Sequence, residues 1–165
     1  MDLKVDDTLV IESGVVQTSL THLLEGYLYS LGEACHRLFG PKGELAMYEA
    51  VGSVFLDYLR KKCDLKLGPD PWERYCQIVA FFTAQGFYSR VELRQLAENK
   101  YWMLETGQFA GAIWEELNAW GRGTPPCPLW SVILYGLAEI GYSVVLDTVN
   151  YIPEISGYDS TLHFV

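Results

Sequence analysis

The chain has 165 residues, a length that suits one domain and that buries roughly two thirds of its surface on folding. Hydrophobic residues make up 50% of it and aromatic residues 14%, so some apolar surface is expected to face a ligand or a partner. The formal net charge of −9 argues against direct binding to nucleic acid. The basic cluster Arg60-Lys61-Lys62 falls at a predicted helix C-terminus, where cations complement the helix dipole.

The cysteines indicate a reducing compartment. Cys35, Cys63, Cys76 and Cys127 show no C-x-x-C spacing, and no charged-then-apolar signal precedes them. We therefore expect a cytoplasmic protein.

Residues 1–16 begin with an acidic segment, and Thr8–Ile11 within them is a short apolar run. This run is interpreted as a short strand or as an arm that packs on a neighbour. Apolar residues at helical spacing then predict one helix over residues 18–39 and a second over residues 42–63, separated by Gly40-Pro41. Glycines within these helices, Gly52 among them, predict close approach of another backbone or of a ligand.

A third helix is expected to begin at Pro71, with Asp70 as its N-cap and Glu73 completing a capping box, and to end at Gly86. Residues 87–96 and 100–105 flank a short polar connection, which predicts a β-hairpin. A fourth helix is expected over residues 107–120.

The stretch Cys127–Tyr151 is the one around which the rest is expected to pack. Between Arg122 and Asp147 its single acid or strong base is Glu139, which predicts a position deep in the core. Pro128 suits the first turn of an apolar helix and Gly141 suits its end.

The residues after Gly141 are largely β-branched, and they predict a buried strand over residues 143–151. A membrane span over residues 129–146 is the competing interpretation. Glu139, Gly141 and the lack of flanking Lys/Arg clusters disfavour it, so no membrane span is expected.

A turn over residues 153–159 and a closing strand over residues 160–165 complete a second hairpin. The predicted order is three helices, a hairpin, two helices, a hairpin. The expected fold class is α+β, with residues 1–165 forming one domain in which helices pack on a face of a single four-stranded antiparallel sheet.

Catalytic motifs for hydrolysis, phosphoryl transfer and dinucleotide binding are missing from the sequence, so no catalytic residue is assigned and no enzyme is expected. Glu33-x-x-His36 has the spacing of a di-iron ligand pair. Such a site needs a second Glu-x-x-His, and the chain has none, so neither a metal nor another cofactor is expected.

Glu139 is the notable lone ionisable group. If it is buried, it must be paired, hydrogen-bonded or shifted in pKa. Arg90 or Arg94 could pair with it, or it could bind the polar head of a ligand. The alternative is that position 139, near the helix end, simply reaches water.

The segment from Gly86 to Val165 resembles the 4-vinyl-reductase-type, hydrocarbon-binding domain. The correspondence covers the Gly86-Phe87 turn and the hairpin after it, a following helix, Cys127-Pro128 leading into a helix with Gly136, and a closing hairpin ending at Phe164. Members of that family include stand-alone proteins, sensor domains, a bacteriochlorophyll-synthesis accessory protein and trafficking-complex subunits. Many carry cysteines in the last hairpin that look like a zinc site, and residues 151–165 contain none.

The resemblance implies a homodimer that encloses an apolar small molecule, such as a lipid or an aromatic compound. The residues expected to contact the ligand are the following: Phe82, Arg90, Trp102, Trp114, Leu117, Trp130, Tyr135 and Glu139. For each aromatic, an ordinary core role is the alternative. At the level of function, the alternatives are a protein-interaction or assembly subunit, and an accessory protein or enzyme of tetrapyrrole metabolism.

Overall fold

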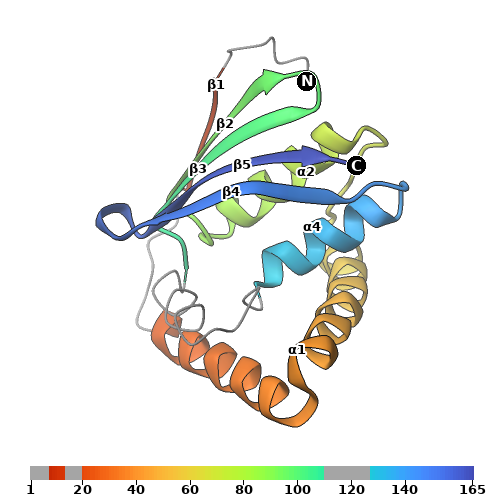
Figure 1. The fold of residues 1–165 in the computed structure, drawn as a ribbon, viewed down its shortest axis with the longest axis vertical. Coiled ribbons are helices and arrows are strands. Elements are labelled where there is room, and N and C mark those ends of the chain that lie inside the picture. Colours follow the sequence, from red (N-terminus) through yellow and green to blue (C-terminus); the bar gives the residue numbers. More distant parts are fainter. Residues whose placement is uncertain (1–7, 14–19, 110–126) are drawn as a thin grey trace.

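The computed structural model describes residues 8–13, 20–109 and 127–165. Within them, five strands form one antiparallel sheet in the order β1-β2-β3-β5-β4, and the helices lie on one side of it (Figure 1). The elements are as follows: β1 Thr8–Glu12, α1 Leu20–Cys63, α2 Pro71–Ala84, β2 Arg90–Ala97, β3 Lys100–Thr106, α4 Pro128–Ala138, β4 Val144–Ile152, a 3-10 turn Pro153–Ile155, and β5 Gly157–Phe164.

The predicted α+β class is right in kind, but the four-stranded sheet is wrong, because residues 8–12 form a fifth strand. β1 pairs antiparallel with β2, from Thr8 opposite Arg94 to Glu12 opposite Arg90. Leu9 and Ile11 pack against the core, which stabilises the strand at the sheet edge. Hairpin signals predict only strands joined by short turns, and β1 has no such turn to β2.

Both predicted hairpins are present. β2 and β3 pair up to Ala97 opposite Lys100, which leaves Glu98 and Asn99 as the connection. β5 starts at Gly157, earlier than the predicted residue 160. Gly157 is required there because a Cβ at that position would overlap the backbone carbonyl of Glu105.

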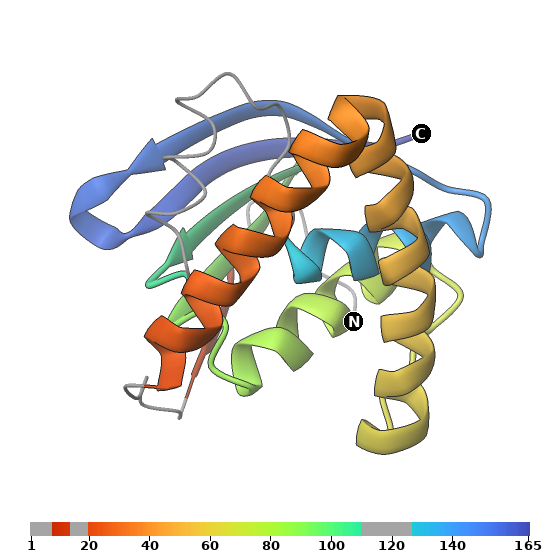
Figure 2. The same cartoon turned by 90° about the horizontal axis from the view of Figure 1, so that it is seen from below.

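α1 is two helices joined at a kink, as the Gly40-Pro41 break predicts. Gly40 has φ 66° and ψ −177°, a conformation that favours glycine. The second half of α1 runs beside α4, and Figure 2 shows the first half leading away from that contact at an angle. The contact is close at Gly52, where a Cβ would overlap the Ser131 carbonyl, so close backbone approach explains this helical glycine.

α2 begins where the capping signal places it. The Asp70 carboxylate accepts a hydrogen bond from the Glu73 amide at 2.8 Å, and Pro71 occupies the first helical position. The first buried residue of the helix, Trp72, stacks on Tyr101 of β3 with ring centroids 4.0 Å apart. Much of the aromatic content is therefore packed into the core between α2 and the sheet.

The predicted burial of residues 127–151 holds for the helix and fails for the strand. Leu129, Ile133 and Leu137 of α4 are fully buried. β4, in contrast, is an edge strand, and Leu146 and Val149 are 38% and 48% exposed. An apolar run predicts that a segment is a strand, but it does not determine whether that strand lies at the centre or the edge of the sheet.

The Gly52 contact gives a direct test of how α1 packs on α4. Gly52→Ala should lower the free energy of unfolding by about 2 kcal/mol or more, because the added methyl group forces the two helices apart. Ser53→Ala, at the next and less buried position, is the control and should change it by less than about 0.5 kcal/mol. Chemical denaturation of both variants measures the difference, and an unchanged Gly52→Ala protein would contradict the close packing.

Candidate functional site

The predicted ligand-contacting residues do not converge on one site among the residues that the structure describes. Phe82 is buried in the core, where its ring meets Phe55, Phe81 and Phe87 edge-on. Trp130 and Tyr135 are half-buried on α4. Trp114 and Leu117, like most of the predicted fourth helix, lie outside the described residues.

Arg90 and Trp102 lie on the opposite side of the sheet from the helices. Arg90 pairs with Glu12 and Glu92, at 3.2 and 3.1 Å. The Trp102 indole N–H donates to Asp159 at 2.8 Å, and the guanidinium of Arg94 lies 4.9 Å from the Trp102 ring centroid. The Glu12, Asp159 and Arg94 contacts are cross-strand pairs, and Glu92 lies two residues after Arg90 on the same strand. They keep Arg90 and Trp102 on the outer face, away from the buried aromatics.

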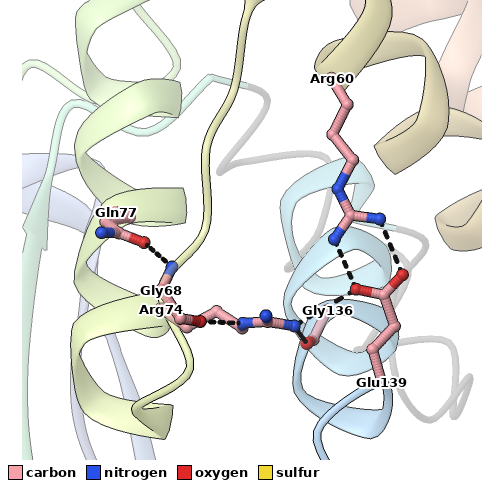
Figure 3. A network of polar contacts seen from close by, with 6 residues as sticks. All are labelled: Arg60, Gly68, Arg74, Gln77, Gly136 and Glu139. Atoms are coloured by element: carbon pink, nitrogen blue, oxygen red, sulfur yellow. Dashed lines mark hydrogen bonds and ion pairs between the residues drawn. The ribbon is translucent and has the colours of Figure 1, made fainter.

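Glu139 is held by two arginines, neither of which is Arg90 or Arg94. It sits at the C-terminal end of α4, and its two carboxylate oxygens accept hydrogen bonds from Arg60 of α1 at 2.8 and 2.5 Å (Figure 3). The hydrogen bond from Arg60 lowers the pKa of Glu139. The prediction that an acid here must be paired or reach water is met in both respects, since its side chain is still 27% exposed.

Arg74 of α2 completes this arrangement from the buried side. Its guanidinium donates to the carbonyls of Gly68 and Gly136, at 2.8 and 2.6 Å, and lies 3.2 Å from Glu139 (Figure 3). The Glu139 cluster, defined as Arg60, Arg74 and Glu139, therefore joins α1, α2 and α4 where α4 ends. Its hydrogen bonds satisfy the Gly136 carbonyl near the end of α4 and the Gly68 carbonyl in the loop before α2, which makes the cluster structural.

The coupling between Arg60 and Glu139 can be measured with a double-mutant cycle. Arg60→Gln and Glu139→Gln should show a coupling energy of about 1 kcal/mol, which falls at high salt because the pair is partly exposed. The matched control is the exposed pair Asp57 and Lys61, 3.9 Å apart, whose coupling should be near zero. Equal coupling in the two pairs would contradict a specific bond between α1 and α4.

Sequence reasoning missed a buried carboxyl at Glu105, on the helix-facing side of β3. Glu105 is 2% exposed, and its Oε1 accepts a hydrogen bond from the Tyr88 hydroxyl at 2.8 Å. Burial raises the pKa of Glu105 to about 7, and the hydrogen bond from Tyr88 partly offsets this rise. Strand alternation could have predicted this burial, because Tyr101 and Met103 are buried at the two preceding positions on the same face of β3.

Two other ionisable groups lie close to this carboxyl. Tyr75 is fully buried and donates to the sulfur of Met103 at 3.0 Å. Burial raises the pKa of the Cys127 thiol to about 12, and the charge of Glu105 adds to the rise. Both Tyr75 and Cys127 are neutral near pH 7, so neither supplies a positive charge to balance a carboxylate at Glu105, and the hydrogen bond to Glu105 comes from Tyr88.

This burial makes stability depend on pH in a defined direction. A folded-state pKa near 7, above the ordinary 4.5, means that the folded protein binds the proton more tightly. The contribution of Glu105 is therefore fully present below pH 4.5 and is lost as pH rises toward 7. Glu105→Gln should remove up to about 3 kcal/mol of this pH dependence.

The measurement is the midpoint of chemical denaturation at pH 5.5 and pH 8, for the original chain and the variant. Glu98→Gln, in the exposed β2–β3 turn, is the control and should leave the difference between the two pH values unchanged. A Glu105→Gln protein with the full original pH dependence would contradict a buried, protonated carboxyl.

Exposed apolar side chains gather on α1 and β4. On α1 they form what we name the α1 apolar surface, in which Leu38 and Val54 are each 73% exposed: Tyr27, Leu31, Leu38, Phe39, Val51, Val54 and Tyr58. On β4, register places Leu146 opposite Leu162 and Val149 opposite Ser160, both of which face the core. Leu146 and Val149 therefore lie on the helix-facing side of the sheet and yet are 38% and 48% exposed.

Among residues 8–13, 20–109 and 127–165, no three or more His, Cys, Asp or Glu side chains are grouped to hold a metal ion. In the same ranges, no helix combines the length and the hydrophobicity required to cross a membrane. Comparison of the chain with family models, curated proteins and solved structures finds no match.

Proposed function

We propose that this protein binds an apolar small molecule, without catalysing a reaction, and works as a homodimer. The observation that supports this proposal is the exposure of Leu146 and Val149 on the side of the sheet that is otherwise buried. A lipid or aromatic ligand lying along β4 would remove these side chains from water, at roughly 25 cal/mol per Å² of apolar surface covered. The resemblance to the hydrocarbon-binding domain supports the same class of ligand.

The arrangement of polar groups is consistent with binding rather than chemistry. Glu139 is occupied by Arg60 and Arg74. Trp102 and Arg90 pair with neighbours on the outer face of the sheet. The side chains proposed to contact the ligand are therefore apolar ones, which would give affinity through burial and only modest discrimination between hydrocarbons of similar size.

Native mass spectrometry tests the proposal, followed by solvent extraction of the purified protein. The expected result is the mass of a dimer with an apolar molecule bound, which solvent then extracts. The Val149→Lys variant should lose that molecule. Val10→Lys, at a comparably exposed valine of the opposite edge strand β1, is the matched control and should retain it. A ligand-free mass, unchanged after incubation with fatty acids and aromatic hydrocarbons, would contradict ligand binding.

A second candidate function, that of an assembly subunit, is favoured by the α1 apolar surface. Val51, Val54 and Tyr58 recur at helical spacing on the side of α1 away from buried Leu56 and Leu59. Such a stripe is typical of a helix that packs against another protein. Native mass spectrometry of the intact chain and of Val54→Glu separates the candidates, because a ligand receptor keeps its extractable ligand in this variant, whereas an assembly subunit loses its partner.

A further inference from the structure

The edge strand β4 lacks the features with which proteins usually protect the edge of a sheet. Within the described sheet it pairs with β5 alone and lies last in the strand order (Figure 1). Its nine residues include neither Lys nor Pro. Its one charged residue, Asp147, is held within its own chain, by His163 at 2.9 Å and by Lys100 at 3.9 Å. An edge of this kind is a template for pairing with another strand, whereas β1, at the opposite edge, has only five residues.

The hydrogen bonds at the start of β4 show which of its backbone groups face outward. Ser143 and Val165 exchange both of their backbone hydrogen bonds, at 2.8 and 2.9 Å. In an antiparallel ladder, such pairs alternate with pairs that exchange no hydrogen bond. Val144 and Leu146 belong to the second kind, so their N–H and C=O groups point away from β5 and toward the edge of the sheet.

A β-bulge at Asp147 shifts this alternation by one residue. The register with β5 changes between Leu146 and Thr148, so Asp147 is the extra residue of β4. Before the bulge, even-numbered residues direct their backbone groups to the edge, and after it odd-numbered residues do. Val149 and Tyr151 are therefore the outward-directed residues in the second half of the strand.

The β4 edge is complementary to itself as a result. The outward-directed residues lie symmetrically about the midpoint between positions 147 and 148: Val144, Leu146, Val149 and Tyr151. A second copy that runs antiparallel places its Val149 opposite Leu146. The same register places its Tyr151 opposite Val144, and each pair can exchange both backbone hydrogen bonds. The two bulges lie opposite each other, so neither strand is left with an unmatched residue.

We propose that the homodimer forms through β4, with the strands of two copies paired antiparallel in this register so that the two sheets become one. The proposal rests on the homodimer proposed above and does not depend on a ligand. Opposite residues of an antiparallel pair project from the same face, so Leu146 and Val149 of one copy lie beside their counterparts on the helix-facing side. Each Asp147 is already paired within its own chain, so the contact brings together no uncompensated like charges.

This register also specifies where an apolar ligand would lie. Leu146 and Val149 are 38% and 48% exposed in the single chain, and pairing brings the two copies of both side chains into one apolar strip. A ligand that lies along β4 therefore contacts both protomers, and its site is incomplete without the second copy.

Disulfide cross-linking tests the register. The variant Leu146→Cys/Val149→Cys is made in a Cys63→Ser background, which removes the exposed native thiol. It is oxidised with diamide and analysed by intact and peptide mass spectrometry. Residues that lie opposite each other and exchange hydrogen bonds have Cα atoms about 5.5 Å apart, a distance that a disulfide spans. We expect a covalent dimer in which position 146 of one chain is linked to position 149 of the other.

The single variants Leu146→Cys and Val149→Cys, in the same background, are the matched controls. In the proposed register, position 146 lies about 10 Å from position 146 of the second copy, and the same holds for position 149, which is too far for a disulfide. Positions 146 and 149 of one chain are about equally far apart, so no link should form within a chain. The double variant should therefore give covalent dimer at least about tenfold faster than either single variant.

Four results would overturn the β4 interface. One is a protein that stays monomeric in native mass spectrometry. Another is a non-covalent dimer whose double variant does not cross-link, and a third is equal cross-linking of single and double variants, which would show that no register exists. Loss of the cross-link on adding Val54→Glu, but not on adding Val10→Lys, would assign the dimer to the α1 apolar surface instead.

Failure of this interface is distinguishable from failure of ligand binding. A monomer that still yields an extractable apolar molecule would contradict the β4 dimer and leave ligand binding standing. A dimer cross-linked between positions 146 and 149 that yields no such molecule would support the β4 interface and contradict ligand binding.

Discussion

The burial of α4 determines how the other helices are placed. Leu129, Val132, Ile133 and Leu137 are all fully buried, so this helix needs covering elements on several sides. α2 and the second half of α1 both pack against it. The contact with α1 is close because Gly52 has no side chain, and the Glu139 cluster then fixes the three helices relative to one another where α4 ends.

The two notable acids, Glu139 and Glu105, lie in opposite environments. Glu139 meets two arginines at the rim, where partial exposure and charge pairing lower its pKa. Glu105 lies inside, with the Tyr88 hydroxyl as its hydrogen-bond donor among the described residues, and burial raises its pKa. The difference follows from position alone, because a carboxyl at a helix end can be reached by long basic side chains, whereas one on the inner face of a central strand is surrounded by aromatic and aliphatic groups. The first acid stabilises the helix packing at neutral pH, and the second makes the stability of the fold depend on pH.

Local sequence signals predicted the elements well and their arrangement poorly. The Asp70 cap, the Gly40 break and the Pro128 start all depend on a few neighbouring residues, and the structure confirms each of them. Local sequence patterns do not reveal contacts between residues far apart in the chain. The pairing of β1 with β2, the edge position of β4 and the arginines around Glu139 all depend on such contacts. The same limit applies to side chains within one strand: alternation along β3 places Trp102 on the outer face, away from buried Phe82, while Glu105, three residues later, faces the core.

Amide hydrogen exchange at pH 5.5, read by peptide along the chain, tests most directly whether α4 is the packing centre. We expect α4, β3 and β5 to exchange together and most slowly, through global unfolding. The part of α1 around exposed Leu31 and Leu38 should exchange fastest among the described helices. Exchange of α4 ahead of that part of α1 would contradict it, because the helix around which the others are packed cannot open before the one that is least covered.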